Sequence, residues 1–437
     1  MIGSFHGGVH PPDKKDKSLL NPIRKMNPPD RVIIPLIQHI GAPAAPCVKV
    51  GDSVCTGSLI GMPDGFISSA VHASISGTVK RIDMFPHPVL GMAPAVMIES
   101  DGKDTLDPSI HEVDVLSYTA EDIIACVKAC GIVGLGGAAF PAHVKLSPPE
   151  TKPIDTIVIN GAECEPYLTC DHMTMLFSPL KVLRGAAAVT KAVGATRCII
   201  GIEDNKMDAI ELLKSKVRSE GFTNIEVEAL HVKYPQGAEK QLIYALTKRE
   251  VPAGGLPMDI GIVVHNVGTV AAIQDALRYR KPLYERLVTV VGTSLRASYN
   301  MSVRIGTSFE DVIAATGGLL SPPKKMIMGG PMMGIAQERF DVPVIKGTSG
   351  ILLFNKVDFD LGKPGPCIRC GRCVDICPMH LVPSALSIFG EREAYEDADG
   401  YNVNDCMECG ACTYVCPAKR PIVHIIKKIK HVLRQKK

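Results

Sequence analysis

CIRCGRCVDICP at residues 367–378 and CMECGACTYVCP at residues 406–417 decide the fold of the last quarter of the chain. Each run spaces four cysteines as C-x2-C-x2-C-x3-C and continues into a proline. A tight loop of this kind presents three thiolates to three corners of a cubane iron–sulfur centre, while the fourth thiolate comes from elsewhere in the chain. The doubled spacing therefore predicts two [4Fe-4S] clusters.

In the bacterial two-cluster arrangement the fourth cysteine of each run ligates the other cluster. We therefore expect a first cluster set made of Cys367, Cys370, Cys373 and Cys416, and a second cluster set made of Cys406, Cys409, Cys412 and Cys377. Structural zinc is the alternative, but zinc needs only four ligands and is typically held by two C-x2-C pairs. Two neighbouring clusters transfer single electrons, so the chain is expected to work in a redox chain.

Length, charge and hydropathy exclude several other classes of protein. The chain has 437 residues, enough for several separate cores. Its 48 basic and 45 acidic residues give a net charge of +3, too small for a general nucleic-acid-binding protein. No apolar run reaches the roughly 18 to 20 residues of a bilayer span, and the start lacks the apolar middle of a secretory signal. We expect a cytosolic protein, with docking on a membrane complex left open.

Residues 46–82 alternate short β-type runs with glycine turns. This pattern resembles the half-repeats of biotinyl and lipoyl carrier domains. Those carriers need a lysine on the hairpin between the halves, and no lysine occurs from Val50 to Val79. The segment is therefore expected to be a scaffold or docking module.

Helices and strands alternate through the middle of the chain. Strands are expected at residues 154–159, 197–202, 225–230 and 260–264, and helices near residues 180–193, 205–219, 237–248 and 268–280. This alternation predicts an α/β layer with a largely parallel sheet. Residues 286–334 follow as a small mixed unit.

A glycine-rich stretch, GIVGLGGAAFPAHVK at residues 131–145, matches the loose dinucleotide fingerprint. The fingerprint normally follows a strand, whereas a helix is expected before these glycines, so a glycine helix stop is the alternative. The next strand ends in NGAECEP at residues 160–166, and the carboxyl end of a parallel strand is where α/β sheets bind ligands. The two stretches together favour a flavin and a nicotinamide nucleotide.

The residues resemble a known family at this point. The two stretches just quoted, with YPQGAEKQL at residues 234–242 and HNVGTVAAI at residues 265–273, resemble the FMN- and NADH-binding subunit of respiratory complex I. FHGGVHPPDKK at residues 5–15, the carrier-like hairpins and the cysteine runs are similar to the C subunit of the Rnf complex, a membrane-bound ferredoxin:NAD oxidoreductase. The resemblance covers nearly the whole chain.

The resemblance implies a multidomain α/β protein with four parts. They are a β-rich barrel-sandwich hybrid domain (1–113), a complex I-type FMN/NADH-binding α/β domain (114–283), a soluble-ligand-binding β-grasp domain (284–345) and an α-helical two-cluster ferredoxin-like domain with a basic tail (346–437).

It also implies cofactor contacts. FMN is expected at Gly134, Gly136, Gly137, Asn160, Glu163, Tyr234, Gly237, Asn266 and Thr269. NADH is expected to meet Phe140 with its adenine, Lys145 with a phosphate, and Glu165 and Glu239 with its ribose or nicotinamide end. Leu135, Ala162 and Ala238 depart from the complex I pattern, which has an arginine, an aspartate and a glutamate there.

The implied activity is that of a peripheral subunit on the cytoplasmic side of the cell membrane. FMN would exchange a hydride with NAD(H) and single electrons with the two clusters, without a nucleophile or general base in the protein. The expected partners are other Rnf subunits in the membrane, an iron–sulfur subunit that accepts electrons from ferredoxin, and thus ferredoxin indirectly. A non-catalytic electron-wire subunit and a soluble relative that feeds an amino-acid reductase are the alternatives.

Several other groups have more than one interpretation. Cys126 with Cys130, and Cys164 with Cys170, are expected to be buried thiols rather than a further metal site. His6 and His10 are expected to be turn residues, and the methionines at 326, 328, 332 and 333 to lie in a core. The basic tail presents either a solvated helix face or a surface for anionic lipid or a membrane subunit.

Overall fold

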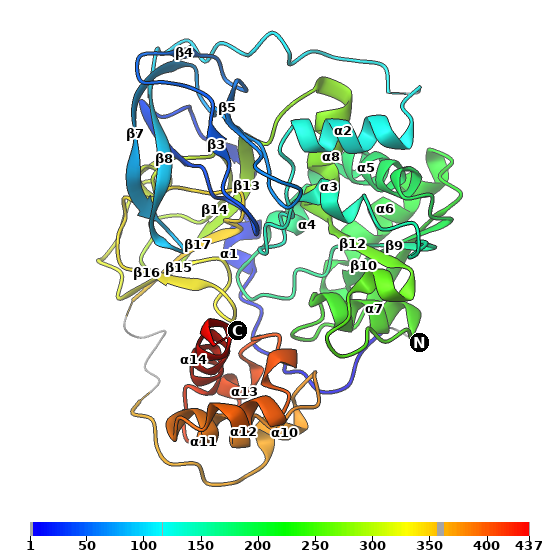
Figure 1. Cartoon of the computed structure of the whole chain (residues 1–437), viewed down its shortest axis with the longest axis vertical. Coiled ribbons are helices and arrows are strands. Elements are labelled where there is room, and N and C mark those ends of the chain that lie inside the picture. Colours follow the sequence, from blue (N-terminus) through cyan, green and yellow to red (C-terminus); the bar gives the residue numbers. More distant parts are fainter. Residues whose placement is uncertain (1–2, 116, 356–361, 437) are drawn as a thin grey trace.

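The computed structural model describes residues 3–115, 117–355 and 362–436 (Figure 1). The N-terminal β-rich part consists of two small sheets packed on each other. One sheet has the strand order β2-β8-β7-β4, with β2 at Arg31–Pro35, β4 at Ser53–Val54, β7 at Gly77–His87 and β8 at Gly91–Ser100. The other joins β3 at Ala45–Pro46, β5 at Leu59–Met62 and β6 at Val71–His72. The predicted barrel-sandwich architecture is confirmed.

The central α/β part is built on a four-stranded parallel sheet in the order β11-β10-β9-β12. Its strands are β9 at Thr156–Asn160, β10 at Arg197–Glu203, β11 at Ile225–Leu230 and β12 at Ile262–Asn266. β9, β10 and β12 run as nearly unbroken apolar stretches because both faces of the sheet are covered, whereas the edge strand β11 alternates apolar residues with exposed glutamates. The predicted strands are confirmed.

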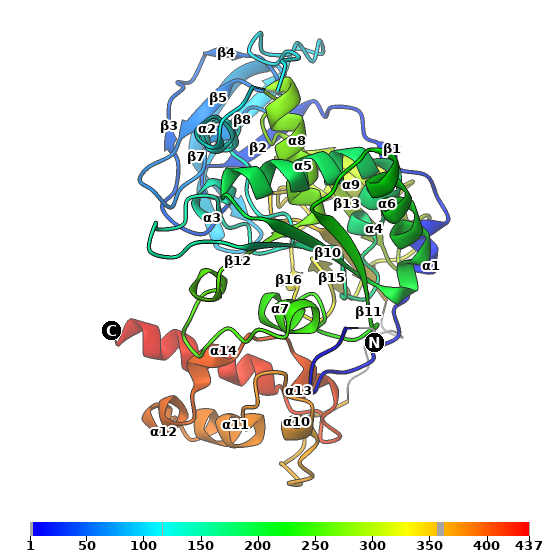
Figure 2. The ribbon, with the colours of Figure 1, turned by 90° about the vertical axis from the view of Figure 1, so that its right-hand side faces the viewer.

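Helices cover both faces of this sheet. The helices of this part are α2 at Ala120–Ala129, α3 at Ala142–Lys145, α4 at Cys170–Phe177, α5 at Pro179–Ala192, α6 at Met207–Ser219, α7 at Glu239–Thr247 and α8 at Val267–Tyr279, with 3-10 turns η1 at Asp204–Lys206 and η2 at Pro257–Ile260. Helix α2 packs on α5 and α8 as an outer layer. Figure 2 shows α5 and α8 on one side of the sheet and α7 on the other, next to the C-terminal part.

A mixed sheet of six strands follows in the order β1-β14-β13-β17-β15-β16. It contains β1 at Arg24–Lys25, β13 at Glu285–Val291, β14 at Tyr299–Arg304, β15 at Lys325–Met328, β16 at Ile335–Gln337 and β17 at Gly350–Phe354, with α9 at Phe309–Ala315 packed on it. β17 pairs with β13 and β15, and β1 pairs with β14. The sheet therefore extends beyond residues 284–345, because one strand before this range and one strand after it contribute hydrogen-bonded pairs.

The C-terminal part is helical. It contains α10 at Arg372–Asp375, α11 at Pro383–Glu391, α12 at Tyr395–Gly400, η4 at Val403–Asp405, α13 at Ala411–Tyr414 and α14 at Ile422–Gln435, while the short helix α1 at Asp16–Leu19 lies against the mixed sheet. Figure 1 shows helices α10 to α14 at the end of the molecule away from the N-terminal β-sheets. None of the described helices has the length and apolar character of a membrane-spanning segment.

Candidate functional site

Two of the predicted flavin residues lie side by side at the carboxyl edge of the parallel sheet. Asn160 ends β9, Asn266 ends β12, and the two are register partners. Asn160 donates from Nδ2 to the Gly237 carbonyl at 2.7 Å and accepts from the Ala162 amide at 3.1 Å. Asn160 therefore ties the NGAECEP loop to the YPQGAE loop.

Asn266 caps α8, and Thr269 attaches the glycine-rich stretch to the start of that helix. The Asn266 side chain caps α8 by accepting from the Gly268 amide at 2.8 Å. The Thr269 hydroxyl accepts from the Leu135 amide at 2.8 Å. These two side chains therefore fix the start of α8 and the position of the glycine-rich stretch beside it.

The glycine stretch forms an open loop. The Gly134 amide donates to the Phe140 carbonyl at 2.8 Å and closes the loop. Gly137 has φ +109°, a conformation that favours glycine, and a Cβ there would meet nothing within 4 Å. At Gly136 a Cβ would lie 3.4 Å from that of Asn266. Gly136 and Gly137 are exposed, so the backbone is accessible for the close approach of a flavin nucleotide.

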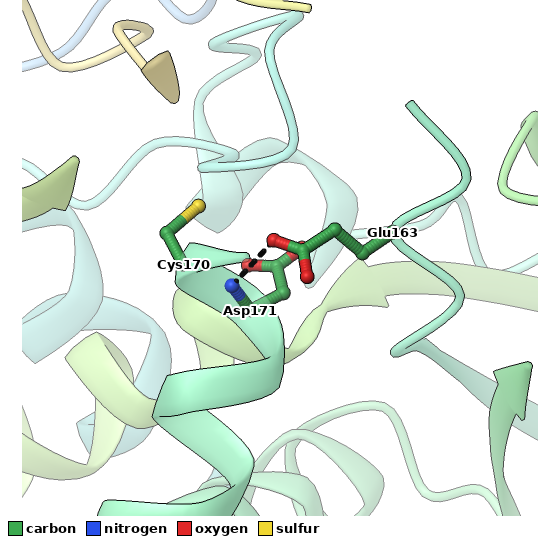
Figure 3. A group of neighbouring side chains, drawn as sticks. All are labelled: Glu163, Cys170 and Asp171. Atoms are coloured by element: carbon green, nitrogen blue, oxygen red, sulfur yellow. Dashed lines mark hydrogen bonds between the residues drawn. The ribbon is translucent and has the colours of Figure 1, made fainter. Parts of the chain in front are cut away.

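Glu163 turns its carboxylate onto the first turn of α4. It accepts from the amide of Asp171 at 2.7 Å (Figure 3) and from that of His172 at 3.2 Å. The Glu163, Cys170 and Asp171 side chains place possible metal-ligand atoms within 4.8 Å of one another. The Glu163 oxygens are already used by the helix, so this group is explained as a cap.

Asp171 supports Asn266, and sequence analysis missed it. Its carboxylate accepts from Asn266 Nδ2 at 2.6 Å. Burial, with the negative charge of Glu163 beside it, raises the Asp171 pKa to about 7. No sequence signal distinguishes this aspartate, because its partner lies on a distant strand.

The predicted NADH residues separate into two groups. Lys145 Nζ lies 2.7 Å from Glu239 Oε1 and 3.1 Å from the Val264 carbonyl, so α3 and the start of α7 meet. Glu165 instead accepts from the amides of Met332 at 3.0 Å and Met333 at 2.8 Å in the loop after β15. Burial raises the Glu165 pKa to about 7. The structure does not bring Glu165 to Lys145 and Glu239.

The methionines near Glu165 do not all belong to a core. Met326 and Met328 are buried in the mixed sheet, whereas Met333 is 46% exposed. The expectation of a four-methionine core was wrong for Met333, because the backbone of that loop is drawn to the Glu165 carboxylate.

Two buried lysines hold the NGAECEP loop, and sequence analysis missed both. Lys15 donates to the carbonyls of Glu163 at 2.9 Å, Glu165 at 3.1 Å and Leu168 at 2.5 Å. Lys206 donates to the Ala162 carbonyl at 2.7 Å. Burial lowers the pKa of Lys15. Lys15 closes the quoted FHGGVHPPDKK motif, but nothing in the motif shows which lysine is buried.

Leu135, one of the departures from the complex I pattern, is buried in the core. Its carbonyl accepts from the guanidinium of Arg286 at 3.3 Å. Arg286 lies on β13, is 6% exposed and is close enough to Asp171 to interact with its charge. A buried arginine thus reaches the glycine loop from another strand, and an arginine within the apolar run RLVTVV is the signal that could have found it.

The second cluster set comes together in space. One cavity is lined by Cys377, Cys406, Cys409 and Cys412, together with apolar residues that include Pro378 and Ile426. Three of these cysteines come from one run and the fourth from the other. This is the crossed pattern expected of a [4Fe-4S] cluster, and the set of four thiols suits that group.

The first cluster set lies nearer the surface. Cys370 is exposed, Cys367 and Cys416 are half-buried and Cys373 is buried. The Gly365 amide donates to the Ala418 carbonyl at 2.8 Å, which brings the chain before Cys367 beside the chain after Cys416. The thiol-rich donor set suits an iron–sulfur cluster here as well.

Tyr234 joins the α/β part to the second cluster set. Its hydroxyl donates to the Cys409 carbonyl at 2.7 Å, and the residue is 1% exposed. In the same loop the Gln236 side chain is fully buried, and neither polar atom of its amide has a partner among the described residues. Such an unpaired buried amide leaves hydrogen-bonding capacity for a bound group.

The N-terminal arm, residues 3–15, runs along the same junction. The Gly8 amide donates to the Ile376 carbonyl at 2.8 Å, and Val9 and Tyr234 exchange backbone hydrogen bonds. The rings of His6 and His380 stack with centroids 5.2 Å apart. His6 and its neighbours therefore contact the cysteine run, and Gly7 and Gly8 take positive φ as expected of a turn.

Of the four cysteines expected to be buried thiols, three are buried and Cys164 is half-buried. Cys126 and Cys130 lie in the core, and Cys170 lies beside Glu163. Cys164 accepts from the Gly237 amide at 3.2 Å and so stands within the flavin loops.

The basic tail forms α14, whose apolar face is covered. Ile422, Ile426 and Ile429 are buried in the core of the C-terminal part. Lys428 pairs with Glu393 and Lys436 with Glu396 on the outer side. An apolar helix face for insertion into lipid is therefore absent from the described part of this helix.

Comparison with known proteins identifies three parts of the chain. Family models match the RnfC barrel sandwich hybrid domain at residues 3–103, the Nuo51 FMN-binding domain at residues 127–275 and a 4Fe-4S dicluster domain at residues 366–419. The fold is also similar to a chain of an NAD+-reducing [NiFe]-hydrogenase, with a TM-score of 0.51 and 18% identity over 74% of this chain and 62% of that one.

Two relatives resemble the chain over almost its whole length. It is 49% identical to the C subunit of the proton-translocating ferredoxin:NAD(+) oxidoreductase complex of Clostridium ljungdahlii, covering 98% of this chain and 94% of the relative. It is 48% identical to the C subunit of the Na(+)-translocating ferredoxin:NAD(+) oxidoreductase complex of Acetobacterium woodii, covering 97% and 96%. The chain therefore belongs to the family of C subunits of the ion-translocating ferredoxin:NAD oxidoreductase complexes, the Rnf complexes, with an FMN-binding domain and a domain for two [4Fe-4S] clusters.

Proposed function

We propose that this chain passes electrons between NAD(H), bound at the carboxyl edge of the parallel sheet, and the second cluster set, and from there to the first. The contact between the Tyr234 hydroxyl and the Cys409 carbonyl carries the proposal, because it joins a flavin loop to a loop of cluster ligands. The exposed Cys370 marks the outer end of the path.

A bound FMN would couple the two-electron chemistry of NADH to the one-electron chemistry of the clusters. The chain positions it and adjusts its surroundings. The glycine loop offers accessible backbone for the flavin. Asn160 holds the NGAECEP and YPQGAE loops together, and Asn266 caps α8. The Lys145–Glu239 pair would face the bound NADH. Phe140, which closes the glycine loop through its carbonyl, would stack on the adenine.

The family membership supports a proposal for the partners and the location of this chain. We assign the chain to the cytoplasmic side of the membrane as a peripheral subunit, together with membrane subunits and an iron–sulfur subunit that receives electrons from ferredoxin. The similarity to the C subunits of ferredoxin:NAD(+) oxidoreductase complexes supports this assignment over a soluble relative that serves an amino-acid reductase.

The test is cofactor analysis of anaerobically purified protein followed by mixing with NADH. We expect FMN, about eight irons per chain from two cubanes, and bleaching of the flavin and then of the clusters when NADH is added. Zinc in place of iron would overturn the proposal. Iron without flavin and without an NADH response would favour the electron-wire alternative, which the departures at Leu135, Ala162 and Ala238 motivate.

A further inference from the structure

The two cysteine runs differ in charge at one equivalent position. Arg369 precedes Cys370 in the first run, and Glu408 precedes Cys409 in the second. Both residues take positive φ, 56° and 62°, so the two loops have the same local shape. Arg369 is exposed and forms no ion pair within the described part of the chain. One loop thus carries a cation where the other carries an anion.

Glu408 is matched by a buried lysine from the tail. Lys430 on α14 lies 2.6 Å from Glu408 Oε1 and donates to the Cys406 carbonyl at 2.9 Å. Lys430 is 8% exposed, whereas Lys427 and Lys428 on the same helix face solvent. The inward direction of Lys430 comes from the helical spacing that also buries Ile426 and Ile429.

Both charges lie against the loop that carries Cys406 and Cys409, Glu408 from within the loop and Lys430 from α14. The Glu408 amide donates to Cys406 Sγ at 3.4 Å, so its backbone touches a ligand sulfur while its carboxylate is held by Lys430. Lys430 reaches the carbonyl of that same cysteine. The ammonium and the carboxylate are therefore fixed beside the cluster with opposite signs.

We propose that the Lys430–Glu408 pair sets the reduction potential of the second cluster, the one nearer the flavin loops. The inference rests on the proposed function. Reduction adds negative charge to a cluster, so a neighbouring cation raises its potential and a neighbouring carboxylate lowers it. Little solvent screens a charge as buried as that of Lys430. Lys430 is thus a positioning and charge-compensating residue.

Potentiometric titration of the holoprotein, followed by EPR and visible absorbance, tests the inference. Lys430→Met should move the potential of one cluster to a more negative value, and Glu408→Gln should move that same potential to a more positive value. The double variant should return close to the parent, and Lys430→Arg, which keeps the charge, should retain the parent potential.

Matched controls lie on the chain itself. Lys428→Met removes an exposed cation from α14 and should shift neither potential. Arg369→Gln changes the equivalent position of the other loop and should move only the other potential, which assigns the two waves.

A structural role alone predicts a different pattern. If Lys430→Met and Glu408→Gln shift the potential in the same direction, or leave it unchanged with full iron content, the inference is overturned while the proposed function stands. A parent protein without iron would overturn both, and iron analysis separates these outcomes.

Discussion

At the residue scale, the polar side chains of the candidate flavin site mostly bind backbone groups of the protein. Asn160 and Thr269 form hydrogen bonds with neighbouring loops, and Asn266 caps α8. Lys15 donates to three carbonyls of the NGAECEP loop and the residues just after it. A buried carbonyl without a donor is costly, so a loop of this shape exists only with such donors. The site is held in shape by buried polar and charged groups.

Lys15→Met should destabilise the protein by about 3 kcal/mol, since several buried carbonyls would lose a charged donor. The NGAECEP loop should loosen, and FMN should be retained less well. Urea unfolding and the FMN content after gel filtration measure the two effects. Lys17→Met, at an exposed position two residues later, is the control and should resemble the parent. Equal stability of the two variants would contradict the role of Lys15.

Asp171 gives the stability a pH dependence. Its pKa of about 7 in the folded protein exceeds the ordinary value, so the folded state holds a proton that the unfolded chain releases. The protonated Asp171 carboxyl therefore stabilises the folded state fully at pH values below the ordinary pKa of an aspartate. This stabilisation is lost as the pH rises through about 7.

Asp171→Asn should therefore be more stable than the parent at pH 8, by roughly 2 kcal/mol, with a smaller difference at pH 5. Asparagine keeps an acceptor for Asn266 Nδ2. Unfolding by urea at the two pH values provides the measurement, with the exposed Asp64→Asn as the control. If the difference in unfolding free energy between the Asp171 variant and the parent is the same at both pH values, the Asp171 carboxyl is not its source.

At the element scale, close packing of α5 on α8 positions the start of α8. A Cβ on Gly185 would lie 1.9 Å from the Val270 carbonyl oxygen, so only glycine allows this approach. Asn266 and Thr269 stand at the beginning of α8 and contact the glycine loop. The helix pair therefore determines where that loop sits.

Gly185→Ala should lower the stability by about 1–3 kcal/mol, because backbone atoms must move apart. The intrinsic helix preference of alanine, about 1 kcal/mol, acts in the opposite direction and should be outweighed. Thermal unfolding and FMN retention report the effect. Gly400→Ala in α12, where a Cβ meets nothing within 4 Å, should cause no loss. A Gly185 variant as stable as its parent would refute the proposed packing constraint.

At the scale of the whole molecule, the N-terminal arm connects the α/β part to the C-terminal helices. Gly7 packs so closely that a Cβ would lie 2.8 Å from the Ile376 carbonyl oxygen, next to Cys377. Tyr234 and Gln241 add hydrogen bonds to Cys409 and Pro378 across the same junction. The proposed electron path depends on this docking.

Gly7→Ala should loosen the junction and slow the passage of electrons from flavin to clusters, without changing flavin reduction by NADH. Alanine at positive φ adds a strain of about 1–2 kcal/mol. Stopped-flow absorbance separates flavin bleaching from cluster bleaching. Gly65→Ala has the same kind of strain, at φ +89°, but nothing within 4 Å, so cluster bleaching should stay as fast as in the parent. If cluster bleaching slows equally in both variants, backbone strain alone explains the effect and the role of the Gly7 contact is contradicted.

Local sequence patterns predicted the cluster ligands and the parallel sheet of this protein. The doubled cysteine runs predicted the crossed set that gathers around one cavity, and alternating apolar runs predicted the parallel sheet. Both signals are local because cluster loops and strands are set by the spacing of neighbouring residues. The assignment of individual FMN and NADH contacts stays a prediction.

Only the tertiary structure decided which charged residues became buried and what they contact. The spacing of the sequence does not distinguish Lys15 from Lys14, because burial there depends on elements far along the chain. Helical spacing places Lys430 on the buried face of α14, but it does not show that Glu408 and the Cys406 carbonyl are the partners of Lys430. Glu165 turned toward the mixed sheet, and β17 joined that sheet from beyond the expected boundary, for the same reason. Tertiary packing determines which distant segments form hydrogen bonds and ion pairs with each other. A local sequence pattern carries no information about that packing.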